Sequence, residues 1–205
     1  MSKIAWKAGT MLAPVPPALI SCGTVENPNV MTAAWTGIVC TNPALTYVSV
    51  RPSRYSYELI KNSGEFVINL PTVAMAKAVD WCGVKSGRTE NKFLKMGLTA
   101  LPCEHVSAPQ IAQSPVSMEC RVLQVTNYGS HDMFLAEILA VNVDDAYIGK
   151  NEEFNIEKAG LLAYAHGFYY ALGKKIGRFG WSVEKKKTRK KRVLRAKSAL
   201  KSNKK

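Results

Sequence analysis

Two long segments of alternating hydrophobic and polar residues, separated by a glycine turn, most constrain the fold of this chain of 205 residues. They are residues 117–128 (SMECRVLQVTNY) and 133–145 (MFLAEILAVNVDD). Gly129-Ser130 between them is a typical hairpin signal. The pattern predicts an antiparallel hairpin of two long strands, so we expect a mainly β fold.

Shorter segments extend this picture. Residues 18–24, 45–51 and 64–71 are expected to be strands, and in the second of them Thr46, Val48 and Val50 share one face. Two helices are expected: residues 53–64, with Ser53 as N-cap and Gly64 as its end, and residues 72–83, with Thr72 as N-cap and Gly83 as its end. Several strands with short helical insertions predict a barrel or a sandwich.

The charge of the chain is concentrated at its C-terminal end. The net charge is +13, but residues 184–205 hold 12 of the 28 Lys and Arg residues and a single acid, Glu184. We therefore expect one domain over residues 1–183 and a basic tail over residues 184–205, a disordered or weakly helical solvated arm. The tail has no aromatic residue to stack on a base, so nucleic acid is the least favoured partner.

Other patterns exclude several classes of protein. No apolar run approaches the roughly 18 residues of a membrane span, and the N-terminus does not have the pattern of a signal peptide, so the expected location is the cytoplasm. The five cysteines are odd in number and form no C-x-x-C pair, which argues against a disulfide framework and a zinc site. No spacing predicts a catalytic triad or a metal cluster. G-x-G-x-x-G is absent, which argues against a Rossmann domain.

Residues 29–43 (NVMTAAWTGIVCTNP) form an unusual stretch with hardly any charge. Threonines and asparagines alternate with alanines around Trp35. A core strand would be more uniformly apolar, and an exposed loop would carry more charge and no tryptophan. The composition favours a backbone against which a flat, polar molecule lies.

Two basic segments could bind an anion. Residues 49–57 (SVRPSRYSY) place Arg51 and Arg54 around the start of a predicted helix, where free N–H groups favour negative charge. A surface turn with solvated arginines is the alternative. Residues 82–93 (CGVKSGRTENKF) form a basic, glycine-containing loop that lacks the spacing of a phosphate-binding P-loop. The histidines, His105, His131 and His166, are each more typical of structural residues.

Several motifs in order along the chain resemble one known family. They are N-x-M-T-A-A-W from residue 29, C-T-N-P from residue 40, S-x-R-P-S-R-Y-S from residue 49, G-E-F-V-I-N-L-P from residue 64, and the later GSHDMFLAEI (129–138) and YYALGKKIGRFGWS (169–182). Together they resemble the flavin reductase-like family of FMN-binding split barrels, and its flavoredoxin-like branch in particular. The resemblance covers about residues 10–182 and leaves the tail without a counterpart.

The resemblance implies a split β-barrel with short helical insertions, FMN as cofactor, and a homodimer in which some residues could serve the partner's site. Trp35 could shield one face of the flavin ring, and His131 and Tyr169 would lie on the substrate side. The implied cofactor-binding residues are Asn29, Met31, Thr32, Ala33, Ala34, Trp35, Cys40, Thr41, Asn42, Ser49, Arg51, Arg54, Ser56, Leu70, Pro71, Trp81, Cys82, Ser86, Gly87, Lys92 and Phe93.

Two functions follow from the resemblance. In the first, the protein is an FMN-dependent oxidoreductase that takes electrons from a reduced nicotinamide, NADH or NADPH, and gives them to a flavin, a protein or a small acceptor. In the second, it is a non-enzymatic electron carrier between redox partner proteins. No feature of the sequence separates the two.

Overall fold

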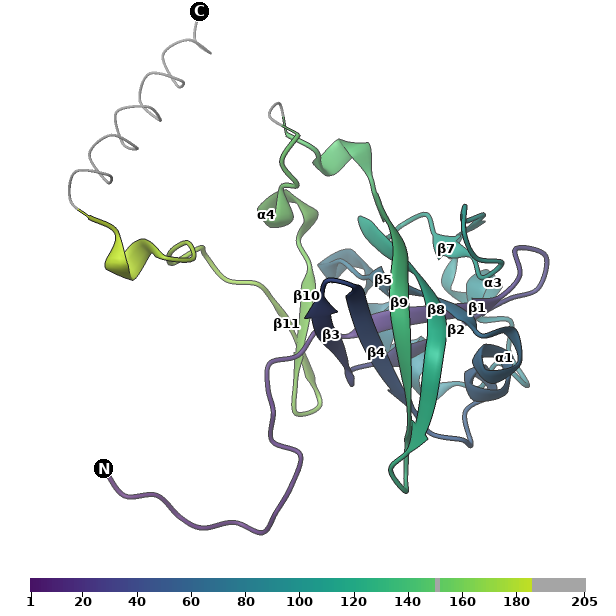
Figure 1. Cartoon of the computed structure of the whole chain (residues 1–205), viewed down its shortest axis with the longest axis horizontal. Helices are drawn as coiled ribbons and strands as arrows, with labels where there is room; N and C mark the ends of the chain where they lie inside the picture. Colours follow the sequence, from purple (N-terminus) through teal and green to yellow (C-terminus); the bar gives the residue numbers. More distant parts are fainter. Residues whose placement is uncertain (150–151, 186–205) are drawn as a thin grey trace, which may run out of the picture. The chain divides into compact units, whose positions relative to one another are not determined.

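An antiparallel sheet of seven strands, in the order β2-β1-β5-β8-β9-β4-β3, forms the body of residues 1–172 (Figure 1). The computed structural model describes residues 1–149 and 152–185. The strands of the sheet are β1 (Ala18–Gly23), β2 (Pro28–Ala33), β3 (Thr36–Thr41), β4 (Ala44–Val50), β5 (Glu65–Leu70), β8 (Val116–Asn127) and β9 (Asp132–Val143).

The predicted long hairpin is confirmed as β8 and β9. The chain reverses through Tyr128–His131, where Gly129 has a φ of 88° and the Tyr128 amide donates to the His131 carbonyl oxygen. On its outer edges β8 pairs with β5 and β9 pairs with β4. The hairpin therefore lies in the middle of the sheet and joins its two halves.

The predicted strands at 18–24, 45–51 and 64–71 are confirmed as β1, β4 and β5. In β4 the face that the alternation assigned to Thr46, Val48 and Val50 is buried, while the residues between them are half-buried or exposed. A period of two in the sequence thus corresponds to one buried face.

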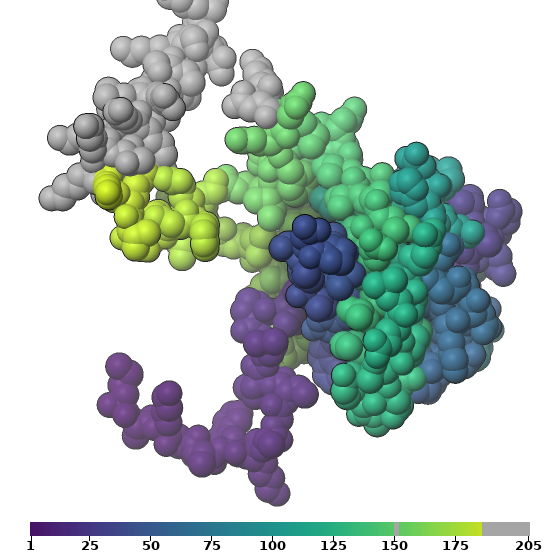
Figure 2. Space-filling model, in the orientation of Figure 1, coloured from purple at the N-terminus to yellow at the C-terminus, as the bar shows by residue number. Residues whose placement is uncertain are grey.

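Residues 29–43 supply the two edge strands, β2 and β3. The edges of β2 and β3 remain unpaired among the described residues, although β2 contacts β4 as the sheet curls. A curled sheet whose edges do not join is a split barrel, which confirms the expected fold class. Figure 2 shows the dark-blue tip of the β3–β4 hairpin projecting beside the green surface of β9.

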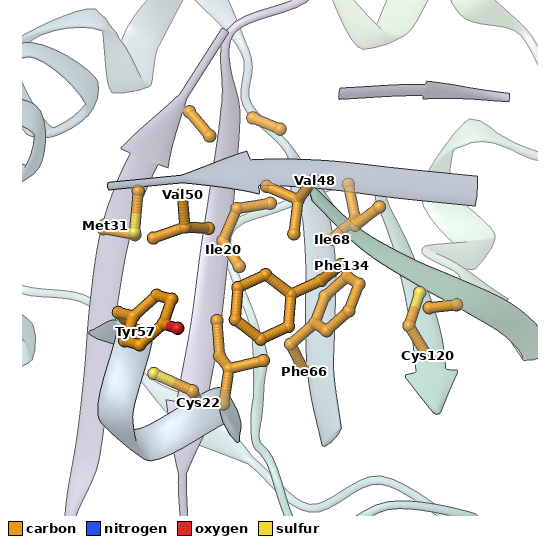
Figure 3. Packing of buried hydrophobic residues seen from close by; sticks show 14 residues of the cluster. Ile20, Cys22, Met31, Val48, Val50, Tyr57, Phe66, Ile68, Cys120 and Phe134 are labelled. Carbon is orange, nitrogen blue, oxygen red and sulfur yellow. The ribbon is translucent and has the colours of Figure 1, made fainter. Parts of the chain in front are cut away.

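The inner face of the curled sheet holds the main hydrophobic core. Phe66 from β5 and Phe134 from β9 are fully buried, and the rings of Phe134 and Tyr57 meet edge to face with centroids 5.4 Å apart. Figure 3 shows these rings converging with Ile20 and Val48 inside the sheet. This core fixes the sheet that carries the site described below.

Two helices differ from the prediction at their ends. They are α1 (Tyr55–Ser63) and α2 (Ala76–Val84), the latter preceded by a 3₁₀ turn, η1 (Val73–Met75). Gly64 ends α1 as predicted, with a φ of 71°, but the N-cap is Arg54 and no side chain caps the helix, so the prediction of Ser53 was wrong. Thr72 precedes η1 without a side-chain cap bond.

Gly83 does not end α2, which continues to Val84. A Cβ atom at Gly83 would lie 3.3 Å from Cβ of Thr32 on β2. The glycine is therefore explained by the close approach of α2 to β2, and its interpretation as a helix end was wrong.

A second core lies on the other face of β1. There Leu19 packs with Val79 of α2, with Phe93 in the short helix that follows, and with Leu162 in a late strand. The remaining elements are α3 (Lys92–Met96), β6 (Ala100–Leu101), β7 (Gln110–Ile111), η2 (Asp145–Tyr147), α4 (Ile156–Ala159), β10 (Leu162–Ala165), β11 (Phe168–Ala171) and η3 (Trp181–Val183). The β10–β11 hairpin is a separate two-stranded sheet.

Residues 173–205 form a second unit. Its described part contains η3 and an ion pair in which Arg178 Nη2 lies 2.6 Å from Glu184 Oε1. Residues 186–205, nearly all of the predicted basic tail, lie outside the described residues. None of the helices in the described ranges has the length and hydrophobicity that a membrane crossing needs.

Candidate functional site

Two adjoining cavities of about 470 Å³ and 430 Å³ share Met31, Arg51 and Arg54 in their walls. The first, which we call the cation cavity, is also lined by Ser53, Tyr55, Ser56, Lys85, Ser86, Gly87 and Lys92. The second, which we call the ring cavity, is also lined by Pro17, Thr32, Ala33, Ala34, Trp35, Ser49, Asp80, Gly83, Val84, His131, Tyr164 and Tyr169. The shared residues make one elongated site.

The cation cavity has a strongly positive lining. Arg51 and Arg54 come from the connection between β4 and α1, Lys85 follows α2, and Lys92 begins α3. None of the described residues that line it is acidic. Helix α1 starts at this wall with Tyr55, so free N–H groups of its first turn add to the positive potential. The cavity suits a phosphate group.

Lys92 makes the strongest case for an anion. Its side chain is buried, with 4% of the residue exposed, and Nζ donates a hydrogen bond of 2.8 Å to the carbonyl oxygen of Cys82. Burial lowers the pKa of this ammonium group, and the charge of Arg54 lowers it further. A buried cation with a neutral partner is costly unless an anion approaches it. A phosphate in the cation cavity would supply that anion.

The loop after α2 comes very close to the floor of the cation cavity. A Cβ atom at Gly87 would lie 2.1 Å from Asn29 Oδ1 and 2.7 Å from Cδ1 of Tyr55. Asn29 is itself fixed, because its Nδ2 donates to Ser56 Oγ over 2.8 Å. Glycine is therefore the residue that lets this backbone close over the cavity.

The ring cavity is built on the turn between β2 and β3. Thr32, Ala33 and Ala34 present small side chains there, and the turn is held by a 2.9 Å hydrogen bond from the Ser49 amide to the Trp35 carbonyl oxygen. Small side chains leave main-chain groups accessible to a flat ligand. This is the arrangement that the composition of residues 29–43 predicted.

His131 lies against Trp35, with ring centroids 4.5 Å apart. Its Nε2 accepts a hydrogen bond from Arg51 Nε over 3.4 Å, and its Nδ1 lies 2.9 Å from Ser130 Oγ. Burial lowers the pKa of the imidazole, as do the charges of Arg51 and Arg54. His131 is therefore a neutral ring at physiological pH, with the proton on Nδ1.

The β10–β11 hairpin and α2 provide another part of the ring-cavity wall. The rings of Tyr164 and Tyr169 have centroids 5.4 Å apart, and Tyr169 donates a hydrogen bond of 3.4 Å from its hydroxyl to Asp80 Oδ1. Burial, together with the nearby Asp80 carboxylate, raises the pKa of Tyr169 to about 12. Tyr169 therefore keeps its proton at neutral pH.

Most of the predicted site residues come together in this site. Those that line the two cavities are Met31, Thr32, Ala33, Ala34, Trp35, Ser49, Arg51, Arg54, Ser56, Ser86, Gly87, Lys92, His131 and Tyr169. Asn29 lies directly behind them through its hydrogen bond to Ser56. Their roles toward a cofactor stay predictions.

The other predicted residues lie away from the cavity walls. Cys40, Thr41 and Asn42 are at the tip of the β3–β4 hairpin. Leu70, Trp81, Cys82 and Phe93 pack in the hydrophobic cores, and the Pro71 carbonyl oxygen accepts from the Leu162 amide at the start of β10. For the packed residues the structure offers roles behind the site, and the contact of Cys40, Thr41 and Asn42 with a flavin ring stays a prediction.

Sequence reasoning did not place eight lining residues in a ligand site. They are Pro17, Ser53, Tyr55, Asp80, Gly83, Val84, Lys85 and Tyr164. Ser53 and Lys85 stood in segments already considered for anion binding. Asp80 and Tyr164 gave no local signal, because it is the packing of β10–β11 beside α2 that brings them together.

Comparison with known proteins agrees with this geometry. The flavin reductase like domain model matches residues 10–173. The structure of flavoredoxin from Desulfovibrio vulgaris (Miyazaki F) is 31% identical, covers 89% of this chain and all of that one, and superposes with a TM-score of 0.83. Flavoredoxin from Methanosarcina acetivorans is 27% identical over 90% of this chain and all of its own, with a TM-score of 0.80.

An uncharacterized protein of Archaeoglobus fulgidus is 40% identical over 144 residues, which are 70% of this chain and 81% of that protein. The FMN-binding domain of a flavin reductase-like enzyme from Shewanella baltica is 25% identical over 80% of this chain and 88% of its own, with a TM-score of 0.69. The match to the domain model over most of the chain, on a split barrel with a site of this form, shows that the chain belongs to the flavin reductase-like domain family.

Proposed function

We propose that the protein is an FMN-dependent oxidoreductase that moves electrons from a reduced nicotinamide, through bound FMN, to a flavin, protein or small acceptor. The elongated site is the observation that carries this proposal. One end is cationic, with no acid among its described lining residues, and the other end has small side chains and a tryptophan. A molecule with one phosphate and one flat ring fits both ends.

The residues present fit FMN, and the family and its FMN-binding structures support it as the cofactor. Arg51, Arg54 and Lys92 supply the cations for one terminal phosphate, as expected from the sequence. The chain has no G-x-G-x-x-G for the pyrophosphate of FAD. Bound FMN supplies the capacity to accept a hydride and to pass electrons on.

The protein's own groups would bind the cofactor and orient it. The turn from Thr32 to Trp35 would offer main-chain donors and acceptors to the ring, and Trp35 would shield one face of it. His131 offers a neutral imidazole toward the same cavity, which is suited to hydrogen bonding and imposes no charge on it. Catalysis of hydride transfer by such a site is mainly alignment of the two reactants.

The similarity to two flavoredoxins is the reason to consider a second candidate function. In it, the protein is a non-enzymatic carrier that passes electrons between partner proteins. A homodimer is expected under both candidate functions. Phe168 and Tyr170 of β11 and Leu172 just after it are each more than half exposed, which favours a partner that covers them.

One set of spectra tests the proposal. The cofactor of the protein as purified is released by denaturation and identified by chromatography. The protein is then reconstituted with FMN and mixed anaerobically with NADH or NADPH while the flavin absorbance is followed. Rapid bleaching by one nicotinamide is the expected result. Bleaching only by a reduced protein partner favours the carrier. Released FAD, or no flavin after reconstitution, rules out both candidates.

A further inference from the structure

The one acid among the described residues that line either cavity lies at the ring end. It is Asp80, whereas Arg51 and Arg54 line both cavities and Lys85 and Lys92 line the cation cavity alone. An exposed carboxylate is negatively charged at neutral pH. A bound phosphate would lie among the cations, so Asp80 is the negatively charged side chain that a second molecule would meet at the ring cavity.

The position of Asp80 is fixed by its surroundings. Its Oδ1 accepts a hydrogen bond from the Tyr169 hydroxyl, and Tyr169 stands directly opposite Tyr164 in the β10–β11 pairing. Tyr164 is in turn held by two backbone hydrogen bonds of 2.9 Å to Val15. The carboxylate is thus tethered to a wall of the ring cavity.

No ion pair among the described residues involves Asp80. Lys77, one helical turn before Asp80 on α2, forms no ion pair with it. On the same cavity wall His131 is neutral, so Asp80 supplies the negative charge at the ring end, where Arg51 and Arg54 are the cations.

We propose that Asp80 is a specificity-determining residue: its carboxylate, tethered through Tyr169, favours cationic or neutral electron acceptors at the ring cavity and disfavours anionic ones. This inference rests on the proposed function, because the electrons come from reduced FMN. Two electrons leave each reduced FMN: two equivalents of a one-electron acceptor take one each while the protons go to water, and one equivalent of a quinone takes both together with two protons. Asp80 takes no part in the chemistry and acts through its charge.

The test compares three acceptors of different charge. The FMN-loaded protein is reduced with one equivalent of dithionite and mixed in a stopped-flow instrument with ferricyanide, benzoquinone or hexaammineruthenium(III). In Asp80→Asn we expect reoxidation by ferricyanide to become faster and reoxidation by hexaammineruthenium to become slower, each about two- to fivefold, with benzoquinone unchanged. The differences should shrink as salt is added.

Two variants serve as controls. Asp80→Glu keeps the charge and should behave as the wild type. Glu104→Gln changes the net charge of the protein equally, at an exposed side chain that lines neither cavity, and should also behave as the wild type. Equal rates for Asp80→Asn and the wild type, or equal changes in Asp80→Asn and Glu104→Gln, would overturn the inference.

A second measurement does not depend on the flavin. In the apoprotein, the alkaline titration of Tyr169 is obtained from the ultraviolet difference between the wild type and Tyr169→Phe. Asp80→Asn should lower the pKa of Tyr169 from about 12 toward its ordinary value of 10.0. An unchanged titration would show that the carboxylate is not tethered there. Failure of the proposed function is seen separately, as a protein that takes up no FMN.

Discussion

Arg51 donates a hydrogen bond from Nε to Nε2 of His131 across 3.4 Å, and so joins the two ends of the site. Arg51 lines both cavities, whereas His131 lines the ring cavity alone. A cation placed for a phosphate therefore also sets the tautomer of an imidazole at the other end. Changes at Arg51 are expected to affect both cofactor binding and the environment of the ring.

Replacement of Arg51 or Arg54 by alanine should weaken FMN binding. A charge-assisted contact to phosphate is worth about 1.5–3 kcal/mol, or roughly a 10- to 100-fold loss of affinity. Lys92→Ala should act in the same direction. Titration of flavin fluorescence measures the affinities, with Lys95→Ala, exposed on α3 and outside both cavities, as the control. If all three variants bind as tightly as the wild type, the phosphate lies elsewhere.

Alanine at position 87 should be poorly tolerated. The added Cβ would meet Asn29 and the Tyr55 ring at less than contact distance, and Asn29 is held by its bond to Ser56. Overpacking of this kind costs about 1–3 kcal/mol, which thermal unfolding would detect as a lower Tm. Gly173→Ala is the matched control, because nothing lies within 4 Å of its Cβ position. Equal Tm values for the two variants would contradict the close approach of this loop.

Glu119→Gln should lower the free energy of unfolding at neutral pH. It should also make that free energy depend less on pH in the acid range. Burial raises the pKa of this carboxyl, but hydrogen bonds from the Asn142 side chain and from the His105 and Glu104 amides outweigh burial and hold the pKa below its ordinary value of 4.5. The folded pKa is lower than the unfolded one. The carboxylate therefore stabilises the fold fully above pH 4.5, and this contribution is lost as pH falls through the folded value.

We expect a loss of about 1.5–3 kcal/mol in Glu119→Gln at neutral pH, measured by urea unfolding, and a smaller loss in acid. Glu104→Gln, whose side chain is exposed, is the control. A difference from the wild type that stays constant from neutral to acid pH would show that Glu119 does not stabilise the fold through its charge.

The protein should be a homodimer in solution. Phe168, Tyr170 and Leu172 are 66%, 52% and 54% exposed in the isolated chain, an apolar row that favours burial against a second copy. Light scattering at micromolar concentration should give twice the mass of one chain. Phe168→Glu should shift the mass toward one chain, whereas Leu94→Glu, an exposed apolar residue on α3, should not. A wild-type mass of one chain would refute the dimer.

Residues 184–205 should be dispensable for the fold and for FMN binding. Their dense positive charge and few apolar residues leave little surface to bury against a core. A chain ending at Ser182 is expected to keep its FMN and its mass in solution, with a Tm within a few degrees of the full chain. It should lose only salt-sensitive binding to polyanions such as heparin. Aggregation or loss of colour would show that the tail is a structural element.

The sequence predicted the central strands well, either as an apolar run that is buried on both faces, as in β1, or as an alternation with one buried face, as in β4. Alternation alone placed Val48 and Val50 in the core, and Gly129 marked the turn between the two longest strands. The helix ends were less predictable. Ser53 has the right chemistry for an N-cap, yet α1 begins at Tyr55 without a side-chain cap, and Gly83 is explained by its approach to Thr32. The contact of Gly83 with Thr32 is a tertiary one, which local sequence patterns do not contain.

The candidate site was predictable where residues that are close in the sequence form it. Arg51 and Arg54 flank a helix start, and Thr32 to Trp35 form one turn, so local composition was enough. Asp80 is different, because it enters the site through Tyr169, which is distant in sequence. The edge strand β2 carries threonine and alanine in place of regular alternation, because Thr32 and Ala33 face the ring cavity.

The central place of the β8–β9 hairpin has a consequence for how the sheet assembles. In the described sheet, strand pairing joins β2, β1 and β5 to β4 and β3 only through this hairpin. The hairpin itself closes a short loop at little entropic cost, whereas the pairings of β5 with β8 and of β4 with β9 join segments distant in sequence. The paired strands are therefore close in sequence within the hairpin and distant in sequence on both of its sides. Neither half of the barrel can enclose the aromatic core before this hairpin holds them both.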